Sequence, residues 1–115
     1  MKTFKKTAAQ GDVYFERIDK LPEGAVEVPP EGDYVIVAHS ETGHHHVMDR
    51  AKTKMYRLPE EIYECFLVVE EQDVLEHQRE EHTHESIQFE PGVYRVNNQR
   101  EQSLGNERIT RAVAD

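Results

Sequence analysis

The sequence predicts an all-β fold, either a small single-domain barrel or a two-sheet sandwich, with a jelly-roll-like form among the alternatives. Short runs of apolar and β-branched residues recur along the 115 residues, and Gly or Pro signals separate most of them. No long amphipathic helical pattern appears. We therefore expect roughly eight or nine short strands, and the length fits one domain with one core.

The N-terminal part is expected to hold a tail and the first strand. Residues 1–9 read as a flexible basic tail, and residues 10–115 as a single β domain. A turn signal at Gly11-Asp12 introduces a strand at 13–18. Prolines at 22, 29 and 30 then exclude a helix and interrupt strand pairing.

The middle of the chain is expected to supply a hairpin. Residues 33–39 contain consecutive β-branched side chains, which favour a strand. A short connection at 40–43 contains Gly and has a length common in hairpins. Residues 44–48 are the expected returning strand.

Five further strands are expected. Residues 54–58 and 62–69 lie on either side of Pro59, and the second segment has a short helix as its alternative because acids follow the proline. Its Ile, Tyr, Phe and Val residues favour the strand. Residues 86–89 alternate polar and apolar, and a Pro-Gly turn leads into 93–96. A final edge strand is expected at 107–113.

The charge distribution limits the kinds of partner that are expected. The formal net charge is −9, and residues 59–90 contain eleven carboxylates and a single cation, Arg79. Such a surface argues against binding a nucleic-acid backbone, which requires clustered cations. It suits a protein partner with a basic surface or the capture of a metal, and it also suits a solvated face that keeps the protein soluble.

The apolar pattern and the single cysteine indicate where in the cell the protein is expected. No apolar run approaches the roughly 20 residues of a membrane-spanning helix, and no signal peptide is visible. Cys65 is the one cysteine and cannot form an internal disulfide. This indicates a reducing compartment such as the cytoplasm, and Cys65 is expected to be a small buried hydrophobe.

The histidines are the main functional signal. All seven lie between residues 39 and 84, and two pairs have the same spacing: His44 with His46, and His82 with His84. Side chains at i and i+2 of a strand point to the same face. Two such pairs on neighbouring strands would bring four imidazoles to a divalent transition metal, with Zn most expected and Fe, Mn or Ni as alternatives. A solvated histidine-rich loop is the competing interpretation.

The other histidines have weaker roles in this hypothesis. His39 mirrors His44 across the expected turn and is a second-tier ligand candidate. His45 is expected to point away from the site, and His77 to be a solvated surface residue. Carboxylates of Glu81 or Glu85 could complete the shell or orient a ligand histidine.

Common catalytic motifs are missing from the sequence. It has no Gly-rich phosphate loop and no nucleophile elbow of the Gly-x-Ser-x-Gly type. The polar run Gln99-Arg100-Glu101 follows an expected strand and offers an amide, a cation and a carboxylate. A plain polar loop with a salt bridge is the favoured interpretation of this run.

The order of motifs resembles a family of small uncharacterised bacterial and phage-encoded proteins. The matching segments are Gln-Gly-Asp-Val at 10–13, Glu-Thr-Gly-His-x-His at 41–46, the histidine-rich stretch with Gly-x-Tyr-x-Val at 82–96, Gln-Arg-Glu at 99–101 and Val-Ala-Asp at 113–115. The resemblance implies no established activity. It implies His44, His46 and His84 as site residues, with His82 or Glu81 next. The His-x-His strand with the later turn at Pro91-Gly92 is loosely similar to cupins, and this cupin-like resemblance concerns the fold alone.

Three functions compete at this stage. The first is a metal-binding β domain, with catalysis by the metal as an extension of that hypothesis. The second is a phage or mobile-element accessory protein that binds another protein through its acidic face. The third is a structural component that assembles into homo-oligomers through strand edges.

Overall fold

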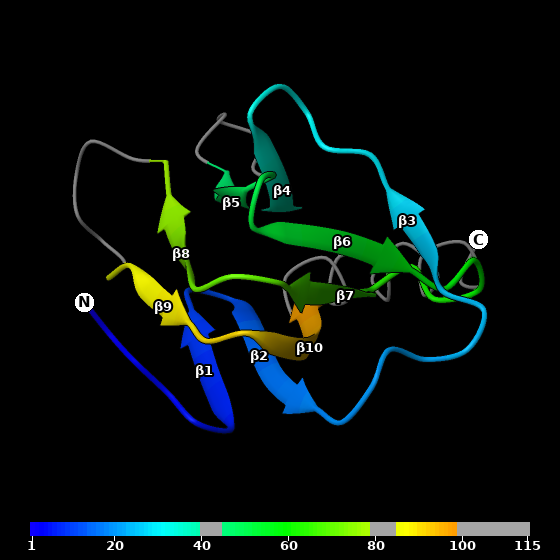
Figure 1. Cartoon of the computed structure of the whole chain (residues 1–115), viewed down its shortest axis with the longest axis horizontal. Helices are drawn as coiled ribbons and strands as arrows, with labels where there is room; N and C mark the ends of the chain where they lie inside the picture. Colours follow the sequence, from blue (N-terminus) through cyan, green and yellow to red (C-terminus); the bar gives the residue numbers. More distant parts are fainter. Residues whose placement is uncertain (40–44, 79–84, 99–115) are drawn as a thin grey trace, which may run out of the picture.

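Ten β-strands make up the described part of the chain, which comprises residues 1–39, 45–78 and 85–98 of a computed structural model (Figure 1). Within these ranges no residue is helical, so no helix there is long and apolar enough to cross a membrane. The strands are β1 (Thr7–Gln10), β2 (Val13–Ile18), β3 (Val26–Val28), β4 (Tyr34–Ala38), β5 (His46–Asp49), β6 (Thr53–Arg57), β7 (Glu64–Val69), β8 (Asp73–His77), β9 (Ile87–Phe89) and β10 (Gly92–Asn98).

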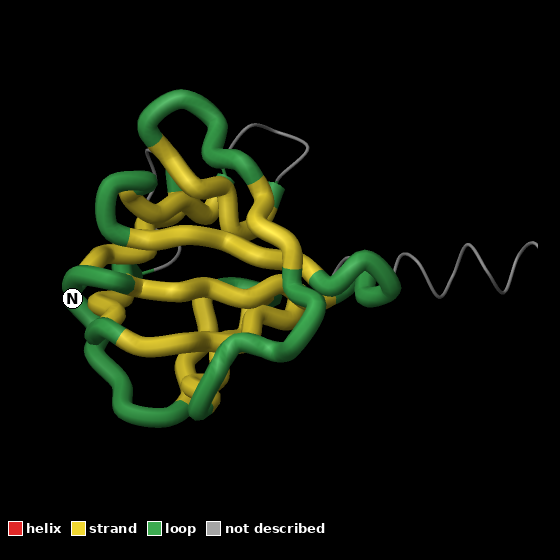
Figure 2. The backbone as a smooth tube through the Cα atoms, turned by 45° about the vertical axis from the view of Figure 1, so that its right-hand side comes forward, coloured by secondary structure: helices red, strands yellow, loops and turns green. Residues whose placement is uncertain are grey.

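The strands form two antiparallel sheets. The six-stranded sheet has the order β1-β2-β10-β7-β6-β3, and the four-stranded sheet has the order β4-β5-β8-β9. Figure 2 shows these strands joined by loops and turns. The predicted all-β domain is confirmed in its two-sheet sandwich form, and not as a closed barrel, because the sheets keep separate edges.

One hydrophobic core fills the space between the sheets. Alternate residues along a strand point to the same face, so each inner face contributes every second side chain. Phe15 on β2, Leu67 on β7 and Tyr94 on β10 come from the larger sheet, and Leu75 and Phe89 come from the smaller one; all five are at most 1% exposed. Cys65 is 3% exposed within the same cluster, which confirms its prediction as a buried hydrophobe.

Most predicted strands correspond to strands of the structure. The seven segments predicted between residues 13 and 96 match β2, β4, β5, β6, β7, β9 and β10, with boundaries that differ by at most a few residues. The strand interpretation of residues 62–69 is confirmed, because β7 occupies most of that segment. The strand predicted at 107–113 lies outside the described residues.

Three strands have no counterpart in the predictions. β3 is a three-residue edge strand that ends before the prolines and pairs with β6. β8 lies in the acidic segment 59–90, and Val74 and Leu75 are its only apolar residues. This weak pattern did not predict a strand, although Asp73 and Leu75 are buried. β1 lies mostly within residues 1–9, the segment expected to be a tail.

The N-terminal segment is packed against both sheets. The amide of Lys2 donates to the carbonyl of Ser86 at 3.0 Å, and the amide of Gln88 donates to the carbonyl of Lys2 at 2.8 Å. The ring of Phe4 lies 4.9 Å from that of Phe89, centroid to centroid, in an edge-to-face arrangement. These contacts join residues far apart in sequence, and a local pattern does not reveal them.

A buried polar contact joins the sheets at one end of β5 and β8. The hydroxyl of Thr53, on β6, donates to the carboxylate of Asp73, on β8, at 2.7 Å. The backbone amide of Asp49, on β5, donates to the same carboxylate oxygen at 2.9 Å. Asp73 is 5% exposed. These hydrogen bonds compensate the desolvation of its carboxylate.

Candidate functional site

Two histidines meet at the opposite end of β5 and β8. β5 and β8 are antiparallel neighbours, and His46 is the direct register partner of His77. Their rings stack with centroids 4.4 Å apart and planes inclined by 17°. His46 shares its face of β5 with core residue Met48, and His77 shares its face of β8 with Leu75. The pair therefore belongs to the inner face of the four-stranded sheet.

Gln10 holds the ring of His46. Its side-chain oxygen Oε1 lies 2.7 Å from Nδ1 of His46. Its amide nitrogen Nε2 donates to the backbone carbonyls of Glu85, at 2.9 Å, and Leu75, at 3.4 Å. Gln10 is 2% exposed and His46 is 9% exposed. One buried amide thus connects β1, β5, β8 and the residues before β9.

These contacts determine which nitrogen of His46 carries the proton. Two carbonyl oxygens surround the Gln10 amide nitrogen, so the opposite amide orientation would bring oxygen against oxygen. Oε1 therefore faces His46 and accepts a hydrogen bond from Nδ1–H. In the neutral ring, the lone pair then lies on Nε2. The hydrogen-bond network assigns this tautomer.

A second pair of histidines lies beside the first. β4 and β5 pair with a register shift between Ile36 and Ala38, so that Ala38 stands opposite His46. The ring of His39 contacts the ring of His45, with centroids 5.0 Å apart, and Nε2 of His39 lies 3.5 Å from a carboxylate oxygen of Glu31. The predicted mirror partner of His39, His44, lies outside the described residues.

The predicted ligands are divided between described and undescribed parts of the chain. His46 is described and lies at the end of β5. His44, His82 and His84 lie outside the described residues, as do Glu81 and the run at 99–101. Within residues 1–39, 45–78 and 85–98, no group of three or more His, Cys, Asp or Glu side chains is arranged to hold a metal ion. The four-histidine site therefore stays a prediction.

Sequence reasoning missed two residues of this cluster. His77 was expected to be a solvated surface residue, whereas it is partly buried and stacked on His46. Its spacing of two and four residues from the buried Leu75 and Asp73 was the available signal. Gln10 was predicted only as the residue at which the domain begins, and no local signal indicated its contact with His46.

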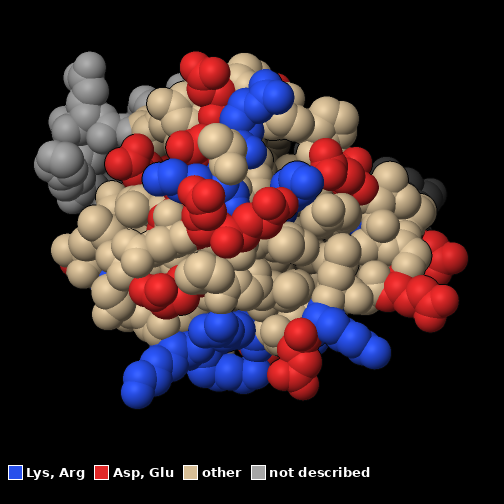
Figure 3. Space-filling view, viewed as in Figure 1, with Lys and Arg blue, Asp and Glu red and all other residues tan. Residues whose placement is uncertain are grey.

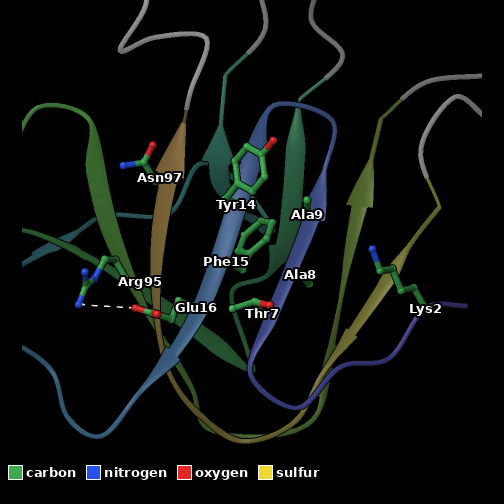
Figure 4. A pocket seen from close by; sticks show the side chains of 9 residues that line it. All are labelled: Lys2, Thr7, Ala8, Ala9, Tyr14, Phe15, Glu16, Arg95 and Asn97. Carbon is green, nitrogen blue, oxygen red and sulfur yellow. Dashed lines mark ion pairs between the residues drawn. The ribbon is translucent and has the colours of Figure 1, made fainter.

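Two surface cavities in the described part of the chain lie away from these histidines. One of about 490 Å³ lies against β1, β2 and β10 of the six-stranded sheet (Figure 4). Another, of about 320 Å³, lies on the outer face of β5 and β8 and is lined in part by Asp33, Asp49 and Glu76. Neither is lined by His46 or His77.

Comparison with known proteins identifies a family for most of the chain. A family model described as a domain of unknown function (DUF8820) matches residues 9–99, from β1 through β10. No curated protein and no solved structure matches the chain.

Proposed function

We propose, from the premise that this chain belongs to the DUF8820 family of domains of unknown function, that it is a metal-binding β domain. The proposed ligands are the two His-x-His pairs, His44 with His46 and His82 with His84. The proposed ion is a divalent transition metal, with Zn²⁺ the first to test, because neutral imidazole is a good ligand for such ions. The single cysteine, which cannot form an internal disulfide, favours a reducing compartment such as the cytoplasm.

The observation that carries this proposal is the hydrogen bond between Gln10 and His46. A metal-binding histidine commonly donates its second ring N–H to a carbonyl or carboxylate, which fixes the tautomer and the ring orientation. The 2.7 Å contact from Nδ1 of His46 to the carbonyl oxygen of Gln10 has this form. It leaves Nε2 as the unprotonated nitrogen, which is the form that a metal requires.

Strand order supports the same proposal. Residue 44 precedes β5 by two positions, and residues 82 and 84 lie between β8 and β9. β5 and β8 are neighbours, and β8 pairs with β9. His77 is a further imidazole beside His46, so it is the first additional residue to substitute.

The chemistry of such a centre depends on its coordination. When bound with an open position, a divalent ion supplies Lewis acidity. The described residues contribute orientation: Gln10 holds the ring of His46, and His46 keeps a proton on Nδ1.

Elemental analysis of untagged protein tests the proposal. We expect about one equivalent of a transition metal, and a higher melting temperature when Zn²⁺ is added, because an ion that binds only the folded state stabilises it. The double variant His44→Ala, His84→Ala should lose both effects. His45→Ala is the matched control, because His45 is the histidine of this tract that is expected to point away from the proposed ligands.

Two outcomes contradict the proposal. The first is a protein that holds less than about a tenth of an equivalent of metal and takes up none on titration. The second is equal metal retention by the double variant and the control. A circular dichroism spectrum of each variant shows that it is folded before the metal is measured.

A second candidate function rests on the acidic cavity. Asp33, Asp49 and Glu76 line the outer face of the four-stranded sheet together with Lys52. This arrangement supports binding of a protein with a basic surface, which is the accessory-protein hypothesis. Such binding would weaken with added salt and in Glu76→Lys, and would persist in the histidine double variant.

A further inference from the structure

The outer edge of β1 has main-chain groups directed away from its own sheet. β1 is the terminal strand of the six-stranded sheet. The amide of Arg17 donates to the carbonyl of Lys6 at 2.8 Å. In an antiparallel ladder the hydrogen-bonded pairs alternate, so Ala8 and Gln10 also bond to β2. The amides and carbonyls of Thr7 and Ala9 therefore point away from β2, toward the open side of the sheet.

A cavity lies beside this edge. It has a volume of about 490 Å³ and is lined by Thr7, Ala9 and Tyr14, with Lys2 and Arg95 at its sides (Figure 4). The side chains of Thr7 and Ala9 are small, whereas Tyr14 is large and 50% exposed. The cavity thus offers room for a side chain against an aromatic ring, next to main-chain groups that can pair with a strand.

The charge around β1 is opposite to that of the whole chain. Residues 1–10 contain three lysines and no acidic residue, although the chain carries −9. In the view of Figure 1, Lys and Arg side chains gather along the lower edge of the molecule, where β1 and β2 lie (Figure 3). Within the cavity, Arg95 pairs with Glu16 at 3.7 Å, while Lys2 lies on the far side of β1 (Figure 4).

We propose that the edge of β1 binds an extended acidic segment of another protein by strand addition. Main-chain hydrogen bonds to Thr7 and Ala9 would give the segment its direction and register. An apolar side chain of the segment would occupy the cavity beside Tyr14. The carboxylates of the neighbouring residues in the segment would face the lysines that precede β1, namely Lys2, Lys5 and Lys6. The segment that fits has acidic and apolar residues in alternation, because alternate side chains of a strand share a face.

A synthetic peptide tests the proposal on the full chain. The probe has seven residues that alternate Glu and Val, and the control probe has Lys in place of Glu. Binding is followed by amide NMR spectra at low salt. We expect the Glu probe to shift the amide signals of Thr7 and Ala9 and to slow their hydrogen exchange. Added salt should weaken this binding, and the Lys probe should leave the spectrum unchanged.

Variants separate the main-chain contribution from the charge contribution. Ala9→Pro removes an edge N–H and should abolish binding. Lys2→Glu should weaken binding about threefold or more at low salt. Lys20→Glu is the matched control, because Lys20 is exposed and does not line the cavity. If Ala9→Pro fails to fold, a Glu probe with N-methylated amides makes the same test from the side of the peptide.

Three results would overturn the proposal. One is the absence of any shift up to about 1 mM probe, the weak end of specific association. Another is equal binding of the N-methylated and unmodified probes. The third is concentration-dependent dimerisation of the protein alone with the same signals shifted, which would assign the edge to a second copy of this chain.

Discussion

Gln10 is a single amide group whose three hydrogen bonds involve both sheets and the candidate site. We predict that Gln10→Ala lowers the free energy of unfolding by about 1–3 kcal/mol, because it leaves buried polar groups of His46 and the neighbouring backbone unsatisfied. Urea denaturation measures the change. Gln88→Ala is the control, since the Gln88 amide bonds the exposed Glu90 at 2.9 Å. Equal losses in both variants would contradict the role assigned to Gln10.

Ionisation of the Tyr94 phenol is expected to make the free energy of unfolding depend on pH in the alkaline range. Burial raises the pKa of its phenol above the ordinary value of 10.0, the nearby Arg17 opposes the shift and Glu90 adds to it. The neutral phenol, which donates to the carbonyl of Glu90 at 2.6 Å, is thus favoured in the folded state. Its contribution to stability is complete below pH 10 and is lost as the pH rises through the higher folded-state pKa.

Tyr94→Phe should therefore change both the stability and its pH dependence. We predict a loss of about 1 kcal/mol at pH 7, from the missing hydrogen bond, and a shallower decline above pH 10. Urea denaturation between pH 7 and pH 11 measures both. Tyr14→Phe, at a half-exposed position, should change stability at pH 7 by less than about 0.5 kcal/mol. An unaltered alkaline decline in Tyr94→Phe would refute the assignment.

At the scale of single residues, the sequence predicted which residue type belongs to the candidate site, but not which side chains contact one another there. His46 was predicted as a site residue from its spacing to His44, a pattern that repeats at His82 and His84. Its hydrogen bond to Gln10 joins positions 36 residues apart, and its stacking on His77 depends on strand order. Neither periodicity nor composition contains that information, because both describe neighbours along the chain.

At the scale of strands, prediction succeeded where burial is repeated locally. β2 and β7 contain β-branched and aromatic residues, and their positions were predicted from that content. β1 contains Ala-Ala-Gln, and β8 contains acidic residues with only two apolar ones. Neither sequence favours a strand by itself, so pairing with neighbouring strands imposes the strand conformation. The register shift between Ile36 and Ala38 likewise has no local signal.

The β1–β2 turn is sensitive to a single glycine. Gly11 has φ of 61° between the paired residues Gln10 and Val13, as a two-residue type II′ turn requires at its first position. We predict that Gly11→Ala lowers the free energy of unfolding by about 1–2 kcal/mol, the cost of a side chain in this conformation. Asp12→Ala is the control, because Asp12 has no positive φ. Thermal denaturation compares them, and matching melting temperatures would contradict the prediction.

At the scale of the whole molecule, the N-terminal segment connects the two sheets. Phe4 packs on Phe89 of the smaller sheet and on Tyr94 of the larger one, and Lys2 bonds the residues beside and within β9. We predict that deletion of residues 2–5 lowers the free energy of unfolding by about 2–4 kcal/mol, mostly through loss of Phe4. Urea denaturation of the deletion variant measures this.

A substitution separates the two contributions of this segment. Phe4→Ala should account for most of the loss, and Lys5→Ala, at an exposed position, for almost none. A deletion variant as stable as the full chain would show that residues 2–5 contribute nothing to folding. The overall architecture could be predicted from the sequence, but this connection between sheets could not, because it depends on contacts between the two ends of the described chain.

The polar contacts of Gln10 and Asp73 lie at opposite ends of β5 and β8, and each crosses from one sheet to the other. Aliphatic surfaces attract each other without direction, so on their own they would tolerate sliding of one layer over the other. Hydrogen bonds at both ends of β5 and β8 allow only one alignment of the two sheets. Aliphatic residues between them can therefore exchange for others of similar volume during divergence, while the layers keep their relative position.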